Sequence, residues 1–375
     1  MKENIIQAIV AKMQRNLDSR QMAQLKTVLA SELHNVEIID YKPDYIDFPY
    51  KVSTFVHPDS PVRRFTDKCS IIRLLYGIKR YLWYIPTIGR KRAFDRFTKQ
   101  YLKLTKKYSC NDGLSKDVPA ADTYIVGSDQ VWNSITMLNG SDSAFYLQFA
   151  PKSKKRLSYA ASFGSISVSE KHKDIIKQWL STFDAISVRE NSGVEVLQDL
   201  GIKGTHVCDP VFLLSKEEWI HNLNISKNDE KYVLIYNLTA KNEQLICDAK
   251  KTADRLGAKL YSVSPMQIKE ADKCFANVGP ERFVSLIFNA SFVFTNSFHA
   301  TAFSIISRRQ FCTYNYHSKA NSSRMHSVLA EMEMLDRLNI TDIDKTIDTP
   351  IDYSTKENLI SISCQNGKDW LLQNI

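Results

Sequence analysis

The amino-acid sequence predicts an α/β fold with two domains, each built on a parallel sheet covered by helices. Short apolar, β-branched runs alternate with amphipathic stretches along most of the chain, which is typical of parallel sheets with helices on both faces. The chain has 375 residues, more than one ordinary hydrophobic core accommodates. The alternation pauses near residues 210–230, so we expect two such units with a cleft between them.

The first domain is expected over residues 35–212. Its predicted strands lie at residues 36–40, 123–126, 156–161 and 185–188, and its predicted helices at 168–181 and 192–200. Gly201 follows the last helix, where glycine ends a helix by taking a left-handed conformation. Residues 1–34 are polar and interrupted by charges, and we predict that they form an atypical helical segment in front of this domain.

The second domain is expected over residues 213–345, followed by a tail or helix over 346–375 that returns to pack on a domain surface. Its predicted strands lie at residues 231–237, 259–263, 291–295 and 310–314, and its predicted helices at 242–256, 281–289 and 300–307.

Composition narrows the class of protein. No apolar run approaches the roughly 20 residues that span a bilayer. The N-terminus is a poor secretory signal, because its apolar stretch is short and interrupted by charges. The seven cysteines are scattered and include no Cys-x-x-Cys pair, so neither a zinc site nor a disulfide framework is indicated. We therefore expect a cytoplasmic protein.

Positive charge is concentrated in a predicted helical insertion over residues 68–108. Between residues 73 and 107 there are eleven Lys or Arg residues and one acid, Asp95. Aromatic residues accompany the cations over 71–84, a mixture that suits contact between 71–107 and anionic lipid headgroups at the inner membrane face. The alternative is a helix pair with a solvated basic face. Nucleic acid ranks last, because no known nucleic-acid motif accompanies the charge.

The most informative stretch is residues 124–133, YIVGSDQVWN, an apolar strand that ends in glycine and polar residues. Ligands of open α/β sheets bind at the carboxyl ends of strands. Gly127 permits a tight turn there, Ser128, Asp129 and Gln130 are expected to face a ligand, and Trp132 is expected to form a wall of the pocket. An ordinary turn after a strand is the alternative.

A second strand ends in the same way at residues 292–303, FVFTNSFHATAF. His299 follows the strand at the start of a predicted helix, where its imidazole is placed to enter the cleft. A helix N-terminus also offers unpaired N–H groups and partial positive charge to an anion. A purely structural histidine is the alternative.

These two stretches, with four others in the same order, resemble the polysaccharide pyruvyl transferase family. The other four are SYAASFG at 158–164, ISVRE at 186–190, VCDPVFLL at 207–214 and NSSR at 321–324. The resemblance covers roughly residues 35–340 and implies two facing Rossmann-like domains, the GT-B architecture. The implied activity is transfer of pyruvate from phosphoenolpyruvate to a sugar of a lipid-linked polysaccharide precursor, as a ketal in capsule or cell-surface polysaccharide. It implies no metal and no cofactor beyond phosphoenolpyruvate as co-substrate.

The resemblance also implies site residues. A phosphate and a carboxylate need fixed cations, and arginine grips two oxygens at once. Arg189 matches the family's arginine and Arg324 is a second candidate, while a structural ion pair is the alternative for Arg189.

His299 is the implied general acid/base, since imidazole titrates near neutral pH. Asp129 is expected to orient or deprotonate the sugar hydroxyl. The remaining candidates are Asn296 and Ser297 for the donor, and Ser128, Gln130, Trp132 and Ser162 for the acceptor. Asp209 is expected to hold the interdomain turn.

Two departures from the family pattern bear on activity. Many members have Arg-Leu-His where this chain has Ser297-Phe298-His299, so Arg308, Arg309 or Arg324 would have to supply the missing cation. Members also open with a strand and a glycine-containing loop, which residues 1–33 do not suggest. Two other functions therefore stay open: a nucleotide-sugar glycosyltransferase of the same architecture, and a catalytically degenerate partner at the membrane surface.

Overall fold

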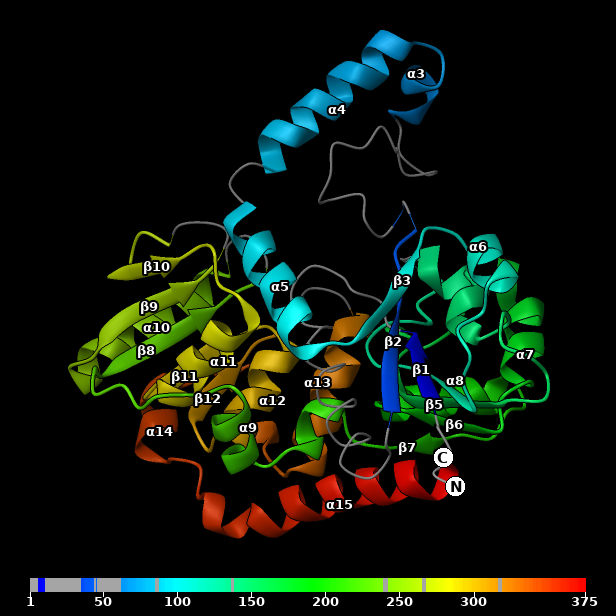
Figure 1. Ribbon diagram of the computed structural model, residues 1–375. Helices are drawn as coiled ribbons and strands as arrows, with labels where there is room; N and C mark the ends of the chain where they lie inside the picture. The colour runs from blue at the N-terminus through cyan, green and yellow to red at the C-terminus, as the bar shows by residue number, and fades with distance from the viewer. Residues whose placement is uncertain are drawn as a thin grey trace.

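The computed structural model describes residues 6–10, 35–43, 45, 62–84, 88–135, 138–238, 242–264, 268–315 and 319–375. Its strands form two parallel sheets, one from each half of the chain (Figure 1). The strand orders are β3-β2-β1-β4-β5-β6-β7 and β10-β9-β8-β11-β12. The order reverses between β1 and β4 and between β8 and β11, the points where open α/β sheets bind ligands. The predicted α/β class is confirmed.

The first sheet places successive side chains of each strand on opposite faces. Ile125 belongs to an apolar cluster shared with the second domain, whereas Tyr124 and Val126 face a cluster covered by α7 and α8. The strands are β1 (Ile6–Val10), β2 (Asn35–Tyr41), β3 (Leu104–Tyr108), β4 (Thr123–Val126), β5 (Lys155–Ala161), β6 (Ala185–Val188) and β7 (Thr205–His206). The helices packed around them are α6 (Asn111–Lys116), α7 (Lys173–Leu180) and α8 (Asn191–Asp199).

The N-terminal segment contains a strand, which corrects the helical prediction there. β1 pairs with β2 on one side and β4 on the other, so it occupies the middle of the sheet. The first strand of the domain is therefore present. Residues 11–34, where helix was also predicted, lie outside the described residues. Residues 104–108, predicted as part of the helical insertion, form the edge strand β3.

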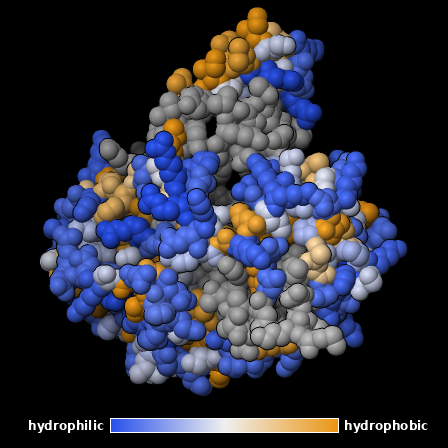
Figure 2. All heavy atoms as spheres, viewed as in Figure 1, coloured by the Kyte–Doolittle hydropathy of each residue, from blue (hydrophilic) through white to orange (hydrophobic). Residues whose placement is uncertain are grey.

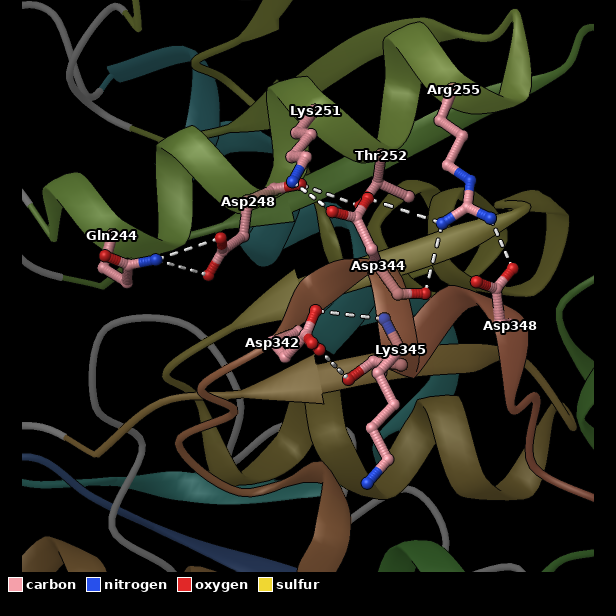
Figure 3. Close-up of polar contacts among 10 residues, drawn as sticks. Gln244, Asp248, Lys251, Thr252, Arg255, Asp342, Asp344, Lys345 and Asp348 are labelled. Atoms are coloured by element: carbon pink, nitrogen blue, oxygen red, sulfur yellow. Dashed lines mark hydrogen bonds and ion pairs between the residues drawn. The ribbon is translucent and has the colours of Figure 1, made fainter.

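The second sheet is covered on one face by α10, which is held to α14 by exposed ion pairs (Figure 3). Arg255 and Lys251 of α10 reach Asp344 of α14, and exposed pairs of this kind stabilise only weakly. The strands are β8 (Tyr232–Tyr236), β9 (Lys259–Val263), β10 (Lys273–Phe275), β11 (Phe292–Thr295) and β12 (Gln310–Thr313). The helices are α9 (Lys216–Asn222), α10 (Glu243–Leu256), α11 (Pro280–Asn289), α12 (Phe298–Ile306), α13 (Lys319–Glu331) and α14 (Ile343–Asp348).

The basic insertion consists of α3 (Arg63–Thr66), α4 (Ser70–Tyr84) and α5 (Ile88–Tyr101). α5 crosses to the second domain, where it packs on α11 and the Arg90 amide donates to Asn277 Oδ1 at 3.1 Å. α4 projects away from both domains (Figure 1). Among the described helices, none has the length and hydropathy needed to cross a membrane.

The last helix, α15 (Glu357–Asn374), runs along both domains (Figure 1). At its start, Glu357 accepts a hydrogen bond from Arg308 Nε of the second domain at 2.8 Å. Past its end, the Ile375 carbonyl accepts from Lys155 Nζ of the first domain at 2.9 Å. Leu371 is fully buried in the apolar cluster that both domains share. The two domains are thus joined by a common core and by one helix.

Candidate active site at the carboxyl edges of the two sheets

The loop after β4 is locked onto the end of β5. Gly127 has φ +138°, and a Cβ there would lie 2.0 Å from the Tyr159 carbonyl oxygen, so glycine allows the two backbones to approach. Asp129 has φ +70°, and its carbonyl accepts from the Ser162 amide at 2.9 Å. The Ser162 carbonyl in turn accepts from the Trp132 amide at 3.1 Å. This geometry fixes where the Asp129 carboxylate points.

Arg189 follows β6 and lies at the centre of a buried ion cluster. Its guanidinium donates to Asp129 Oδ1 at 2.6 Å and to Asp209 Oδ2 at 2.9 Å, and it lies 3.6 Å from Glu190 Oε2. Its fourth contact is the ring of Phe298 in the second domain, whose centroid is 4.9 Å from Cζ. Burial alone would lower the pKa of Arg189, but the three carboxylates outweigh it and raise that pKa above its ordinary value.

This cluster conflicts with the predicted role of Arg189 as the donor clamp. The Arg189 side chain is 0 % exposed, and its charge is matched by the carboxylates around it. The arrangement is the structural ion pair that was the alternative. The second oxygen of Asp209 accepts from the Val211 amide at 3.1 Å, which also fixes the start of the turn after β7.

Arg324 of α13 approaches the same carboxylate from the second domain. Its Nη1 lies 3.7 Å from Asp129 Oδ1. Oriented with its oxygen toward α13, the Gln130 amide accepts from both terminal nitrogens of Arg324, at 3.0 and 2.8 Å. Burial, together with the charge of Arg189, lowers the pKa of Arg324 to about 10, which leaves it protonated at neutral pH. Its side chain is 10 % exposed, so of the two arginines it is the one a ligand can reach.

The second strand end carries Asn296, Ser297 and His299, and it reaches the cluster through Phe298, which packs on Arg189. Asn296 donates to Asn237 Oδ1 at 2.6 Å and accepts from the Leu238 amide at 2.8 Å, which ties β11 to β8 at the reversal of strand order. Ser297 is the N-cap of α12, but its buried hydroxyl makes no capping hydrogen bond. His299 lies in the first turn of α12, with its ring edge-on to Phe298 at 5.3 Å. One aromatic ring therefore separates His299 from Arg189.

The three predicted hydroxyl ligands differ in their surroundings. Ser128 is buried, and its Oγ has no hydrogen-bond partner among the described residues. Ser297 Oγ is in the same situation within that part of the chain. Ser162, in contrast, donates to Glu190 Oε1 at 2.7 Å and accepts from the Gly164 amide at 3.1 Å. Ser162 thus supports the ion cluster, and its contact with the acceptor stays a prediction.

Trp132 lies in the core behind the loop instead of in a pocket wall. It is fully buried, stacks on Tyr146 with ring centroids 5.7 Å apart, and donates from Nε1 to the Phe145 carbonyl at 2.8 Å. The indole is enclosed by the protein, so its observed role is to pack the core behind the loop, and its contact with the acceptor stays a prediction.

Arg308 and Arg309 do not replace the arginine that the histidine motif lacks. They follow α12 at its far end, nine or more residues beyond His299 and therefore more than about 13 Å away along the helix. Arg308 pairs with Glu357 there. Ser297 stands where many members have arginine, and Phe298, where they have leucine, packs on Arg189.

Sequence reasoning missed Glu190 and Asn237. Glu190 lies two residues beyond the predicted strand 185–188, and Asn237 is the last residue of the predicted strand 231–237. Both therefore stand at strand ends, which was the available signal. Within the described residues, no group of three His, Cys, Asp or Glu side chains could hold a metal ion.

The fold is shared with solved structures of low sequence identity. Arabidopsis thaliana UGT89C1 complexed with quercetin superposes with a TM-score of 0.51 at 9 % identity, over 99 % of this chain and 99 % of that one. A putative UDP-N-acetylglucosamine 2-epimerase from Listeria monocytogenes gives 0.51 at 10 % identity, over 98 % and 90 % of the two chains. The UDP-GlcNAc 2-epimerase of Methanocaldococcus jannaschii gives 0.50 at 11 % identity, over 92 % of each chain. These similarities confirm the GT-B architecture.

Family membership comes from the sequence. No curated protein matches the chain in sequence. The family model for polysaccharide pyruvyl transferases, however, matches residues 18–318, which include both strand-end motifs and the segments that supply Arg189 and His299. The chain therefore belongs to the polysaccharide pyruvyl transferase family.

Proposed function

We propose that this protein transfers pyruvate from phosphoenolpyruvate to two hydroxyl groups of a sugar in a lipid-linked polysaccharide precursor. The observation that carries the proposal is the contact of Arg324 with Asp129, together with the contact between Arg189 and Phe298, the residue before His299 at the start of α12. The presence of β1 weighs against a degenerate cleft, since the strand whose absence suggested one is in place.

The donor is a small, highly charged anion. In this proposal Arg324 holds its carboxylate or phosphate, and the N–H groups at the start of α12 with the Ser297 hydroxyl hold the remaining oxygens. Arg189 does not touch the donor. It fixes Asp129 and, through Phe298, supports the turn that carries His299.

The reaction needs one proton delivered to carbon and two removed from oxygen. As the first sugar hydroxyl bonds to C2 of the donor, the methylene gains a proton and becomes a methyl group. The C2–O bond to phosphate then breaks, the second hydroxyl closes the ketal, and its proton leaves with the phosphate. His299 is proposed as the acid and base for these transfers. Asp129, whose anionic form both arginines stabilise, accepts a hydrogen bond from the sugar hydroxyl and orients it.

The proposal also covers the cellular compartment and the pathway. All seven cysteines are free thiols in the structure, which suits a reducing cytoplasm. We place the reaction there, in the synthesis of capsule or another cell-surface polysaccharide, with no metal and no cofactor besides the co-substrate.

Thermal unfolding with added ligand tests the donor. Phosphoenolpyruvate is expected to raise the melting temperature of the wild-type protein, because it binds only the folded state. The Arg324→Met variant should lose this rise, whereas Arg308→Met, which removes an arginine outside the site, should keep it. A rise with UDP-sugars and none with phosphoenolpyruvate would instead favour a nucleotide-sugar glycosyltransferase.

A second variant separates binding from chemistry. His299→Asn should keep the stabilisation by phosphoenolpyruvate but slow phosphate release in the presence of a lipid-linked precursor fraction by about a hundredfold or more. Wild-type release in this variant would remove His299 from the proposed mechanism.

A further inference from the structure

Helix α4 presents an apolar face to solvent. Ile71, Leu74, Leu75, Ile78 and Leu82 are 68 %, 58 %, 59 %, 46 % and 59 % exposed. With about 100° between successive residues, these five positions fall within an arc of about 100° on one side of the helix. Figure 2 shows the resulting hydrophobic stripe at the top of the molecule, over α4.

The side of α4 opposite the apolar arc is turned toward the rest of the protein. Gly77 is buried and Tyr76 is half-buried, and both point away from the apolar arc. Amphipathic helices on soluble domains normally bury their apolar side and expose their polar side. α4 does the reverse, so its apolar arc is available to a partner outside this chain.

The charge around the arc is strongly positive. Residues 62–84 contain six Lys or Arg residues and one acid, Asp67. That acid is already paired with Arg63 and Arg73. Lys79 borders the arc, and Arg64 lies over the ring of Phe65, which is 50 % exposed. A partner of this surface must therefore offer both an apolar region and negative charge.

α5 is not part of this surface, although the sequence suggested contact over the whole of 71–107. It packs on α11, and the Arg90 amide is bonded to Asn277. Within the described part of the insertion, the exposed large apolar side chains belong to α3, its N-cap Val62 and α4.

We propose that α4 lies in the plane of an anionic membrane surface, with its apolar arc among the acyl chains and its cations at the headgroups. An anionic bilayer supplies both properties that the surface needs. A second copy of this chain fits less well, because pairing two such helices would bring two sets of cations together. With 15 residues, α4 is about 22 Å long, so it can lie in the interface but not span the bilayer. The proposal stands on a different part of the molecule from the active site.

Co-sedimentation of the full-length protein with vesicles tests it. We expect binding to vesicles of phosphatidylcholine mixed with phosphatidylglycerol, and much weaker binding to phosphatidylcholine alone. The Leu75→Ser/Ile78→Ser variant should bind the mixed vesicles at least about tenfold more weakly, because two side chains no longer enter the acyl region. Neutralising Arg64 and Lys79 with glutamine should weaken binding by about fivefold per charge on the mixed vesicles only.

The matched control is Ile166→Ser/Ile362→Ser, which removes two isoleucines that are 63 % and 48 % exposed elsewhere on the molecule. It should bind vesicles like the wild type. All variants should keep the wild-type far-ultraviolet circular dichroism and the same stabilisation by phosphoenolpyruvate, so a failure here would not touch the proposed reaction. No binding of the wild type to mixed vesicles, or undiminished binding of the α4 variant, would overturn the proposal. A wild-type dimer that the α4 variant converts to a monomer, without vesicle binding, would overturn it in favour of self-association.

Discussion

Two arginines contact the same carboxylate, Asp129, but their different surroundings give them different roles. Arg189 has three carboxylates and an aromatic ring around it and no exposed side-chain surface. Arg324 has a lowered pKa and a partly exposed side chain. The sequence placed both near the site but ranked Arg189 first as the ligand. Asp129, Asp209 and Phe298 come from three distant segments of the chain, and no spacing in the sequence reveals that they meet around one guanidinium.

We expect this difference to appear in stability. Arg189→Met leaves buried carboxylates without a counter-charge and should lower the free energy of unfolding by about 3–5 kcal/mol. Arg324→Met should cost clearly less, since Asp129 keeps its pairing with Arg189. Urea denaturation of both variants at neutral pH measures the two losses. Equal losses would contradict the distinction between a structural and a ligand-facing arginine.

The lowered pKa of Arg324 also predicts a pH dependence. Since this pKa is about 10 in the folded protein and the ordinary value is 12.5, the folded state loses the proton first as pH rises. The contribution of Arg324 to the free energy of unfolding therefore increases as pH rises from one pKa to the other, because in this range the unfolded state binds more protons than the folded state. Affinity for phosphoenolpyruvate should fall as pH passes about 10, where the cation is neutralised. Titration calorimetry across this range measures it, with circular dichroism as the control for folding. Constant affinity would exclude Arg324 as the clamp.

At the scale of elements, the strand-end loops determine where the site chemistry lies. The strands at β4, β6 and β11 could be predicted because each is a buried apolar run followed by polar residues. β1 could not, because a run of five residues next to charged neighbours has too little periodicity to separate a strand from a helix. Its pairing with β2 and β4 is a tertiary contact.

Gly127 provides the test at this scale. A methyl group there would meet a carbonyl oxygen of β5 at 2.0 Å, in a backbone conformation that side chains rarely adopt. Gly127→Ala should lower the free energy of unfolding by about 2–3 kcal/mol or more and abolish stabilisation by phosphoenolpyruvate. Gly257→Ala is the matched control, since that glycine also has positive φ, +57°, but an added methyl group would have nothing within 4 Å. It should cost only about 1 kcal/mol and leave binding intact. Equal effects would show that the contact with β5 is unimportant.

At the scale of the whole molecule, α15 connects the domains. Gly367 allows its close approach, because a Cβ there would lie 2.6 Å from Cys208 Sγ and 2.7 Å from the Tyr159 hydroxyl. Gly367→Val should displace α15 and lower the free energy of unfolding by about 1–3 kcal/mol. The melting temperature should then fall by several degrees. Ile362→Val, on the exposed side of the same helix, should change it little. Calorimetry is the measurement, and two separate transitions in Gly367→Val would show that the helix couples the domains. Unchanged melting would contradict this role.

The position of α15 also has a consequence for biosynthesis. Domains generally fold in order as the chain is made, and the last strand of the second sheet, β12, ends at Thr313. The carbonyl that Lys155 binds, however, belongs to Ile375, beyond the end of α15. The first domain must therefore wait for a segment made well after both sheets before this contact can form. The contact that ties the first domain to the segment after α15 therefore forms only once that helix has emerged from the ribosome, later than the strands of either sheet.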